Sequence, residues 1–140
     1  MPSTTAPHGM VVTPHPLATA AGVDALRAGG TAVDAAIAAN AMLAVVYCNA
    51  CGLGGDAFAL IWDPADGRLH GFNGSGRSPA ALTIEAVREA GHDEMPARGP
   101  LAITVPGALD AWVQLLDRFG RRSLADASSP RPRPPTRATR

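Results

Sequence analysis

The spacing of hydrophobic residues changes along the chain, and each type of spacing predicts a different secondary structure. Between residues 17 and 46 the apolar residues recur at helical spacing, in two blocks that a glycine pair separates. Pro16 suits the first turn of a helix, and a glycine pair ends one. Thr31 and Asp34 have the spacing of a capping box, which begins a second helix. The pattern therefore predicts helices at residues 17–28 and 32–46.

The second predicted helix is apolar on almost every side. Its large residues cannot share one narrow stripe; they are Val33, Ile37, Met42, Leu43, Val45 and Val46. A helix of this kind is normally buried between other elements. We therefore expect a layered fold, with more protein on the far side of this helix than a chain of 140 residues readily provides.

A buried β-hairpin is predicted between two glycine-rich bends, at residues 52–55 and 74–76. Residues 57–63 form a short apolar run, Pro64 to Gly67 has turn composition, and residues 68–73 form the return strand. Glycine accepts positive φ and lets backbone or ligand come close. Two such bends joined by a hairpin are typical of an active-site floor.

The remaining patterns are shorter. We expect a strand at residues 9–12, a helix at 83–90 closed by Gly91, a strand at 101–105, and an amphipathic helix that Pro106 opens and Gly120 ends. One face of that last helix carries Leu109, Trp112, Val113 and Leu116. The order of elements favours a mixed fold of the α+β class over a helix bundle or an all-β fold.

Charge divides the chain into a body and a tail. Residues 1–127 hold eight arginines and twelve acidic residues, a net charge of −4, whereas residues 128–140 hold four arginines and no acid. The acidic body, which we expect to be one domain, offers no electrostatic footprint for nucleic acid. The Pro/Arg-rich tail cannot pack, so we expect it to be disordered and to reflect a shifted reading frame or another non-native end. Binding of an acidic partner by this tail is the alternative.

No targeting segment is visible in the sequence. The first residues lack both a basic start and an apolar core, and the longest apolar stretch, residues 35–47, is interrupted by Asn40 and too short to span a bilayer. We therefore expect no membrane partner and a cytoplasmic location.

The two cysteines, Cys48 and Cys51, have C-x-x-C spacing. A redox or zinc role is conceivable, but a redox motif should open a helix after a strand, and structural zinc needs four ligands. His70 and His92 lack ligand spacing to the pair. We expect neither a metal nor another cofactor, and interpret the cysteines as small apolar residues buried beside the glycine bend.

Four stretches carry a family signature when they are taken together and in order. They are HGMVVTPHPLA at residues 8–18, AGGTAVDAA at 28–36, GLGGDAF at 52–58, and VPG at 105–107 before a helix that ends in RFG. Over residues 8 to 127 the chain resembles the N-terminal part of the large subunit of the γ-glutamyltransferase (glutathione hydrolase) family. The resemblance implies the first part of an N-terminal nucleophile (Ntn) hydrolase, an α/β/β/α sandwich made as one precursor that cuts itself into two subunits.

The resemblance also implies a reaction, and a partner that this chain would need for it. In the family, the N-terminal Thr of the small subunit attacks a γ-glutamyl amide such as glutathione, and the acyl-enzyme passes the group to water or an amine. The family motif of two threonines and a histidine has no counterpart in this sequence. We therefore expect the chain alone to be inactive and to need a small subunit from the same precursor.

One substrate contact is expected within the chain. Family members pair an Arg after the second hairpin strand with the substrate α-carboxylate. If Pro79 is aligned with the family's proline, Ser75 occupies that Arg position, and Arg77 follows two residues later, on the same face of an extended segment. Arg77 can replace the missing guanidinium, or the branch can prefer another acyl group, or Arg77 can be a surface residue. Related acylases and amidohydrolases therefore stay open beside glutathione hydrolases.

Three other functions compete with this interpretation. Gly52, Gly54 and Ala57 fit a loose dinucleotide fingerprint, but that fingerprint should follow a strand and open a helix. A non-catalytic interaction module would use the apolar face of Leu109, Trp112 and Leu116 as its interface. A small α+β domain without a deducible role is the third alternative.

Overall fold

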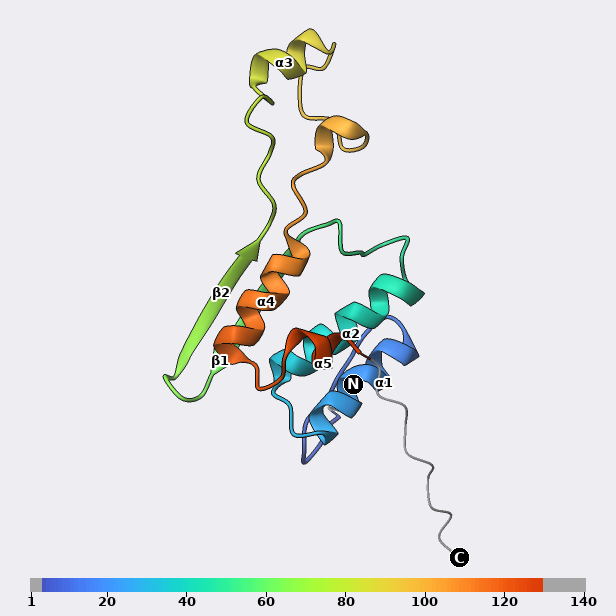
Figure 1. Cartoon of the computed structure of the whole chain (residues 1–140), viewed down its shortest axis with the longest axis vertical. Helices are drawn as coiled ribbons and strands as arrows, with labels where there is room; N and C mark the ends of the chain where they lie inside the picture. The colour runs from blue at the N-terminus through green and yellow to red at the C-terminus, as the bar shows by residue number, and fades with distance from the viewer. Residues whose placement is uncertain (1–3, 130–140) are drawn as a thin grey trace, which may run out of the picture. The chain divides into compact units, whose positions relative to one another are not determined.

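A computed structural model of the chain describes residues 4–129, which fall into two compact units. Among the described residues, one unit comprises 4–51 with 114–129 and the other comprises 52–113, so the boundary falls within α4 (Ala108–Phe119). Figure 1 gives the order of elements along the chain. In the described part of the chain, no helix has both the length and the apolarity that crossing a membrane requires.

The first unit is built on two helices, α1 (Pro16–Arg27) and α2 (Ala32–Val46), which pack against each other (Figure 1). Both predicted helices are confirmed to within one residue. Gly29 has φ of +82°, a left-handed conformation that ends α1 cheaply only at glycine. Small residues let the helices approach closely, because a Cβ on Gly22 would lie 3.1 Å from the carbonyl oxygen of Ala35. The core of the unit follows from this approach: Ala25, Ala35 and Ala38, with Val11 and Leu26 against them.

Asp34 lies in the centre of this unit and is fully buried. Its side chain completes the predicted capping box by accepting the Thr31 backbone N–H at 2.7 Å, while the Thr31 hydroxyl accepts the Asp34 N–H. It also accepts the backbone N–H groups of Arg121 and Arg122 at 3.0 and 3.1 Å. Burial raises the pKa of this carboxyl, but the hydrogen bonds from Thr31, Arg121 and Arg122 outweigh burial and hold the pKa below its ordinary value. One carboxylate thus joins the start of α2 to the segment before α5 (Leu124–Ser128).

The second unit is built on a hairpin of β1 (Ala57–Asp63) and β2 (Arg68–Gly74), which pair antiparallel from Ala57 with Gly74 to Asp63 with Arg68. The predicted hairpin and its turn are confirmed. Gly67 in the turn has φ of +66°. One face of this sheet is exposed, contrary to the buried hairpin that the sequence predicts: Phe58, Leu60, Trp62 and Leu69 are 62–77% exposed. We call these four residues the open face. Alternation along the strands is intact, but the described residues provide no layer to cover this side.

The other elements of the second unit are short. Helix α3 (Ile84–Glu89) lies within the helix predicted at residues 83–90, and the hydroxyl of its N-cap residue, Thr83, accepts the N–H of Ala86. The two outlying predicted strands are wrong. Residues 9–12 form no ladder in the described part of the chain, and Val11 packs on the helices of the first unit instead. Pro100 to Ala102 form a 3₁₀ turn, and Pro106, which has no N–H, blocks a ladder after it.

Helix α4 begins at Ala108, two residues after the proline that was expected to open it. The face proposed as an interface is mostly buried: Trp112 and Leu116 are 4% and 5% exposed, and only Leu109 is largely accessible. The interface predicted on this face is therefore wrong, because two of its three members are core residues.

Candidate functional site

The candidate site is the segment that follows β2: Ser75, Gly76 and Arg77, here called the 75–77 segment. It is attached to the Gly-rich loop before β1 through Asp56, whose Oδ1 accepts the backbone N–H of Gly76 at 2.9 Å. The same oxygen accepts the hydroxyl of Thr104 at 3.2 Å. Thus a bend before the hairpin and a bend after it meet at one carboxylate, although 20 residues separate them in the sequence.

A second set of bonds attaches residues 104–108 to the same place. The carbonyl of Arg77 accepts the N–H of Val105 at 2.9 Å. The carbonyl of Gly55 accepts the N–H groups of Gly107 and Ala108 at 3.1 and 2.9 Å, which ties the Gly-rich loop to the first residue of α4. Hydrogen bonds therefore bring the two glycine bends together, and residues 104–108 join them.

The packing here leaves no room for side chains at two glycines. A Cβ on Gly76 would collide with the carbonyl of Val105, and a Cβ on Gly107 would lie 2.8 Å from the backbone nitrogen of Gly76 and against the carbonyl of Gly74. All of these obstacles are backbone atoms, which cannot rotate away as a side chain can. Glycine is required at both positions for close approach of the backbone.

The two residues predicted to bind substrate, Ser75 and Arg77, are both exposed in this segment. The N–H of Ser75 donates to Oδ1 of Asn73 at 3.0 Å, and its hydroxyl lies 3.4 Å from the carbonyl oxygen of Gly76. The guanidinium and the backbone N–H of Arg77 have no hydrogen bond or ion pair with residues 4–129. Arg77 therefore presents its guanidinium donors and one N–H on a backbone that is fixed from both sides.

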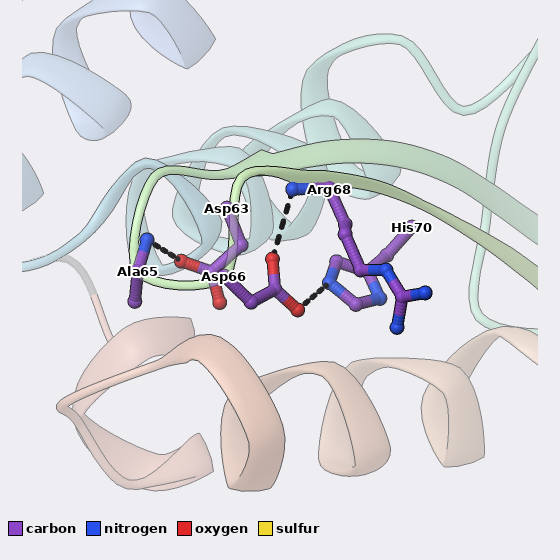
Figure 2. A network of polar contacts seen from close by, with 5 residues as sticks. All are labelled: Asp63, Ala65, Asp66, Arg68 and His70. Carbon is purple, nitrogen blue, oxygen red and sulfur yellow. Dashed lines mark hydrogen bonds and ion pairs between the residues drawn. The ribbon is translucent and has the colours of Figure 1, made fainter.

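A polar cluster at the hairpin turn was missed by the sequence reasoning (Figure 2). Nε2 of His70 lies 2.9 Å from Oδ2 of Asp66, while Asp66 and Asp63 each accept a backbone N–H of the turn, from Arg68 and Ala65. Ligand atoms of Asp63, Asp66 and His70 all lie within 4.8 Å of one another, as a cation site would require. His70 was compared only with the cysteines. The antiparallel register, in which His70 pairs with Ile61, places it on the same face as Asp63 and was the usable signal.

The two cysteines do not match their interpretation as buried residues. Cys48 is exposed and Cys51 is half-buried, both as free thiols, and the Cys51 thiol donates to the carbonyl of Tyr47 at 3.5 Å. The reason is that α2 ends at Val46, so Cys48 follows it in turns on the surface. Neither thiol belongs to a metal-ligand group among residues 4–129.

Comparisons with known proteins point to one family. Residues 18–132 match the sequence model of the gamma-glutamyltranspeptidase family. The chain is 47% identical to the glutathione hydrolase-like YwrD proenzyme of Bacillus subtilis, covering 86% of this chain and 23% of that protein. It is 44% identical to the oxamate amidohydrolase proenzyme of Klebsiella pneumoniae, covering 86% of this chain and 24% of that protein.

A solved structure extends the similarity to three dimensions. The chain is similar to the crystal structure of cephalosporin acylase from Bacillus halodurans, with a TM-score of 0.73 and 49% identity, over 80% of this chain and 21% of that one. The chain thus spans about a quarter of the length of the relatives that it matches.

Proposed function

Because the chain belongs to the γ-glutamyltranspeptidase family, we propose that it serves as the N-terminal part of the large subunit of an amide-cleaving proenzyme. Its α+β fold, as the sequence predicts, is that of the first part of an Ntn-hydrolase sandwich. The proposed reaction is transfer or hydrolysis of an acyl group: a Thr oxygen forms a bond to the acyl carbon, the C–N bond breaks, and the amine leaves with a proton. Water or a second amine then takes the acyl group.

We place the nucleophile outside this chain. No Thr-Thr-His sequence occurs in the 140 residues. The small subunit of the same precursor is the proposed partner and the source of the Thr. The chain by itself is then expected to bind substrate weakly and to leave the amide intact.

The observation that carries the proposal is the state of Arg77. An arginine without a partner, on a segment that hydrogen bonds fix through Gly76 and Arg77 itself, is a prepared receptor for an anion. The relatives support a carboxylate as that anion, because oxamate, glutathione and cephalosporins each carry a carboxylate as well as an amide. We propose that Arg77, with Ser75 beside it, binds the carboxylate of such a substrate.

The test uses a chimera in which residues 1–127 replace the matching segment of the Bacillus subtilis relative. Arg77→Ala should raise KM for a carboxylate-bearing amide about 10- to 100-fold, the worth of a charge-assisted hydrogen-bonded pair. Arg88→Ala is the matched control, since Arg88 is an exposed arginine on α3 whose guanidinium has no hydrogen bond or ion pair with the described residues. Equal KM values for the two variants would remove Arg77 from the substrate site.

A non-catalytic interaction module is the second candidate, and the open face favours it. Four large apolar side chains exposed together on one sheet are typical of a surface that another protein covers. In the chimera, restored self-cleavage and amidase activity would support the enzyme. A folded, inactive chimera that does not cleave itself would support the module.

A further inference from the structure

Asp56 occupies an unusual position for an exposed carboxylate. It directly follows the Gly-rich loop, and its Oδ1 receives hydrogen bonds from Gly76 and from Thr104, which is 48 residues away in the sequence. Bonds to an ionised acceptor are about twice as strong as bonds between neutral groups. A carboxylate that accepts from two distant segments therefore fixes the position of one relative to the other.

Most of the backbone hydrogen-bonding groups of the 75–77 segment already have partners within the chain. The N–H of Ser75 is used by Asn73, the N–H of Gly76 by Asp56, and the carbonyl of Arg77 by Val105. Within residues 4–129, the donors that remain unpaired belong to Arg77, in its backbone N–H and its guanidinium. Asp56 thus holds the peptide group directly before the free donors.

The opposite side of the segment is blocked by backbone. A Cβ on Gly76 would overlap the carbonyl of Val105, so the segment already lies as close to residues 104–105 as it can. Asp56 restrains the segment through Gly76, and Val105 restrains it through the carbonyl of Arg77. Without the Asp56 carboxylate, the N–H of Gly76 loses its acceptor, while the Val105 N–H still donates to the carbonyl of Arg77. The segment would then be held at one point only, and the donors of Arg77 could rotate about it.

We propose that Asp56 is a positioning residue for the substrate site: it fixes Gly76 so that Arg77 meets a substrate carboxylate, without touching the substrate itself. This inference rests on the proposed function of Arg77. Its ligand class is the same, an amide that carries a carboxylate, and Thr104 supports the function by holding Oδ1 of Asp56 from a second direction.

The first measurement is the amide exchange rate of Gly76 in the full 140-residue chain, followed by NMR. Asp56→Ala removes the acceptor and should accelerate Gly76 exchange about 10-fold or more. Asp56→Asn keeps an acceptor oxygen and should restore most of the protection. Asp93→Ala is the matched control, because Asp93 is an exposed acid of the same unit without a hydrogen bond or ion pair in the described residues. Unchanged Gly76 exchange in Asp56→Ala would overturn the inference.

The second measurement is made in the chimeric proenzyme. Asp56→Ala should raise KM for a carboxylate-bearing amide about 10-fold, with little change in kcat, and should leave KM for an amide without the carboxylate unchanged. Asp56→Asn keeps an acceptor oxygen and should therefore restore most of the wild-type KM. If Asp56 acted through its negative charge alone, the two variants would raise KM equally. The double variant with Arg77→Ala should be no worse than Arg77→Ala alone, since both substitutions remove the same contact.

The outcomes separate the two proposals. If Arg77→Ala raises KM and Asp56→Ala does not, the positioning role is wrong while the proposed function stands. If Arg77→Ala leaves KM unchanged, the proposed role of Arg77 is wrong. If Asp56→Ala still raises KM in a chimera that already carries Arg77→Ala, Asp56 does not act by positioning Arg77, and the inference is overturned as well. Equal kcat losses for all substrates in Asp56→Ala would indicate a general structural role and also count against the inference.

Discussion

Replacement of Asp34 by asparagine tests how much one buried carboxylate contributes to the first unit. In the wild-type chain Oδ2 accepts the N–H and hydroxyl of Thr31 and the N–H of Arg121, while Oδ1 accepts the N–H of Arg122. Asparagine has one oxygen. If that oxygen keeps the bonds of Oδ2, the amide nitrogen faces the N–H of Arg122, and two donors oppose each other. The charge that strengthens the remaining bonds is also lost.

The expected cost follows from these contacts. An unsatisfied donor in a buried position costs about 1–3 kcal/mol, and weakening of the capping box adds part of its usual value of about 1 kcal/mol. We expect Asp34→Asn to lower the free energy of unfolding by roughly 2–3 kcal/mol at pH 7, a large share of a typical total of about 5–15 kcal/mol. Urea denaturation followed by circular dichroism measures the difference.

The contribution of Asp34 to the free energy of unfolding should decrease as the pH falls. The pKa of Asp34 lies below its ordinary value of 3.8 in the folded chain, so the ionised carboxylate stabilises the fold above that ordinary value. The contribution is lost as the pH falls through the lowered pKa. Because asparagine does not titrate, the stability difference between the two proteins should be constant from about pH 5 to 8 and shrink below about pH 4.

Asp117→Asn is the matched control for this substitution. Asp117 is exposed near the end of α4, and its carboxylate has no hydrogen bond or ion pair with residues 4–129. It should change stability by less than about 0.5 kcal/mol. The reasoning is refuted if the two variants are equally stable at pH 7, or if the Asp34→Asn difference persists unchanged at about pH 2.5.

Two further predictions concern the second unit. Gly107→Ala should lower the free energy of unfolding by about 1–3 kcal/mol, because the new Cβ would meet the backbone of residues 74–76. Gly54→Ala is the control. A Cβ there meets nothing within 4 Å, so this variant should be nearly neutral in the same urea titration. Leu60→Lys on the open face should reduce self-association and binding of a hydrophobic dye by the isolated chain without lowering its stability. Ile84→Lys, which changes an exposed apolar residue on α3, is the control, and equal effects of both lysines would contradict a special role of the open face.

Much of the local structure could be predicted because its signals are local. Pro16, the glycine pair, the capping box and the turn at residues 64–67 each fix the backbone within a few residues, and all four are observed. The strands expected at residues 9–12 and 101–105 have equally apolar sequences. A strand, however, needs a partner, and sequence pattern alone does not show whether one is present.

The candidate site was predictable only in part for the same reason. The glycine bends are visible as clusters in the sequence, whereas Arg77 was singled out through the family resemblance, by its position relative to Pro79. Asp56 was noted only as part of a Gly-Gly-Asp motif, because its role depends on Thr104 and Gly76, which the fold brings to it from far along the chain. His70 was missed because its partner, Asp66, lies in the turn four residues earlier, and the conformation of the turn brings the two side chains together.

The open face also has a consequence for biosynthesis. In a precursor of the length of the relatives, roughly 400 residues would follow this segment, and at about 5–20 residues per second their synthesis would take roughly 20–80 s. A hairpin can form within about 10 μs, so Phe58, Leu60 and Trp62 would be exposed together on a nascent chain for almost that whole time. During this interval the sheet edge and its apolar side are open to pairing with neighbouring nascent chains. Yield in the cell would then depend on how quickly the ribosome completes the chain and on chaperones that cover the hairpin until it does.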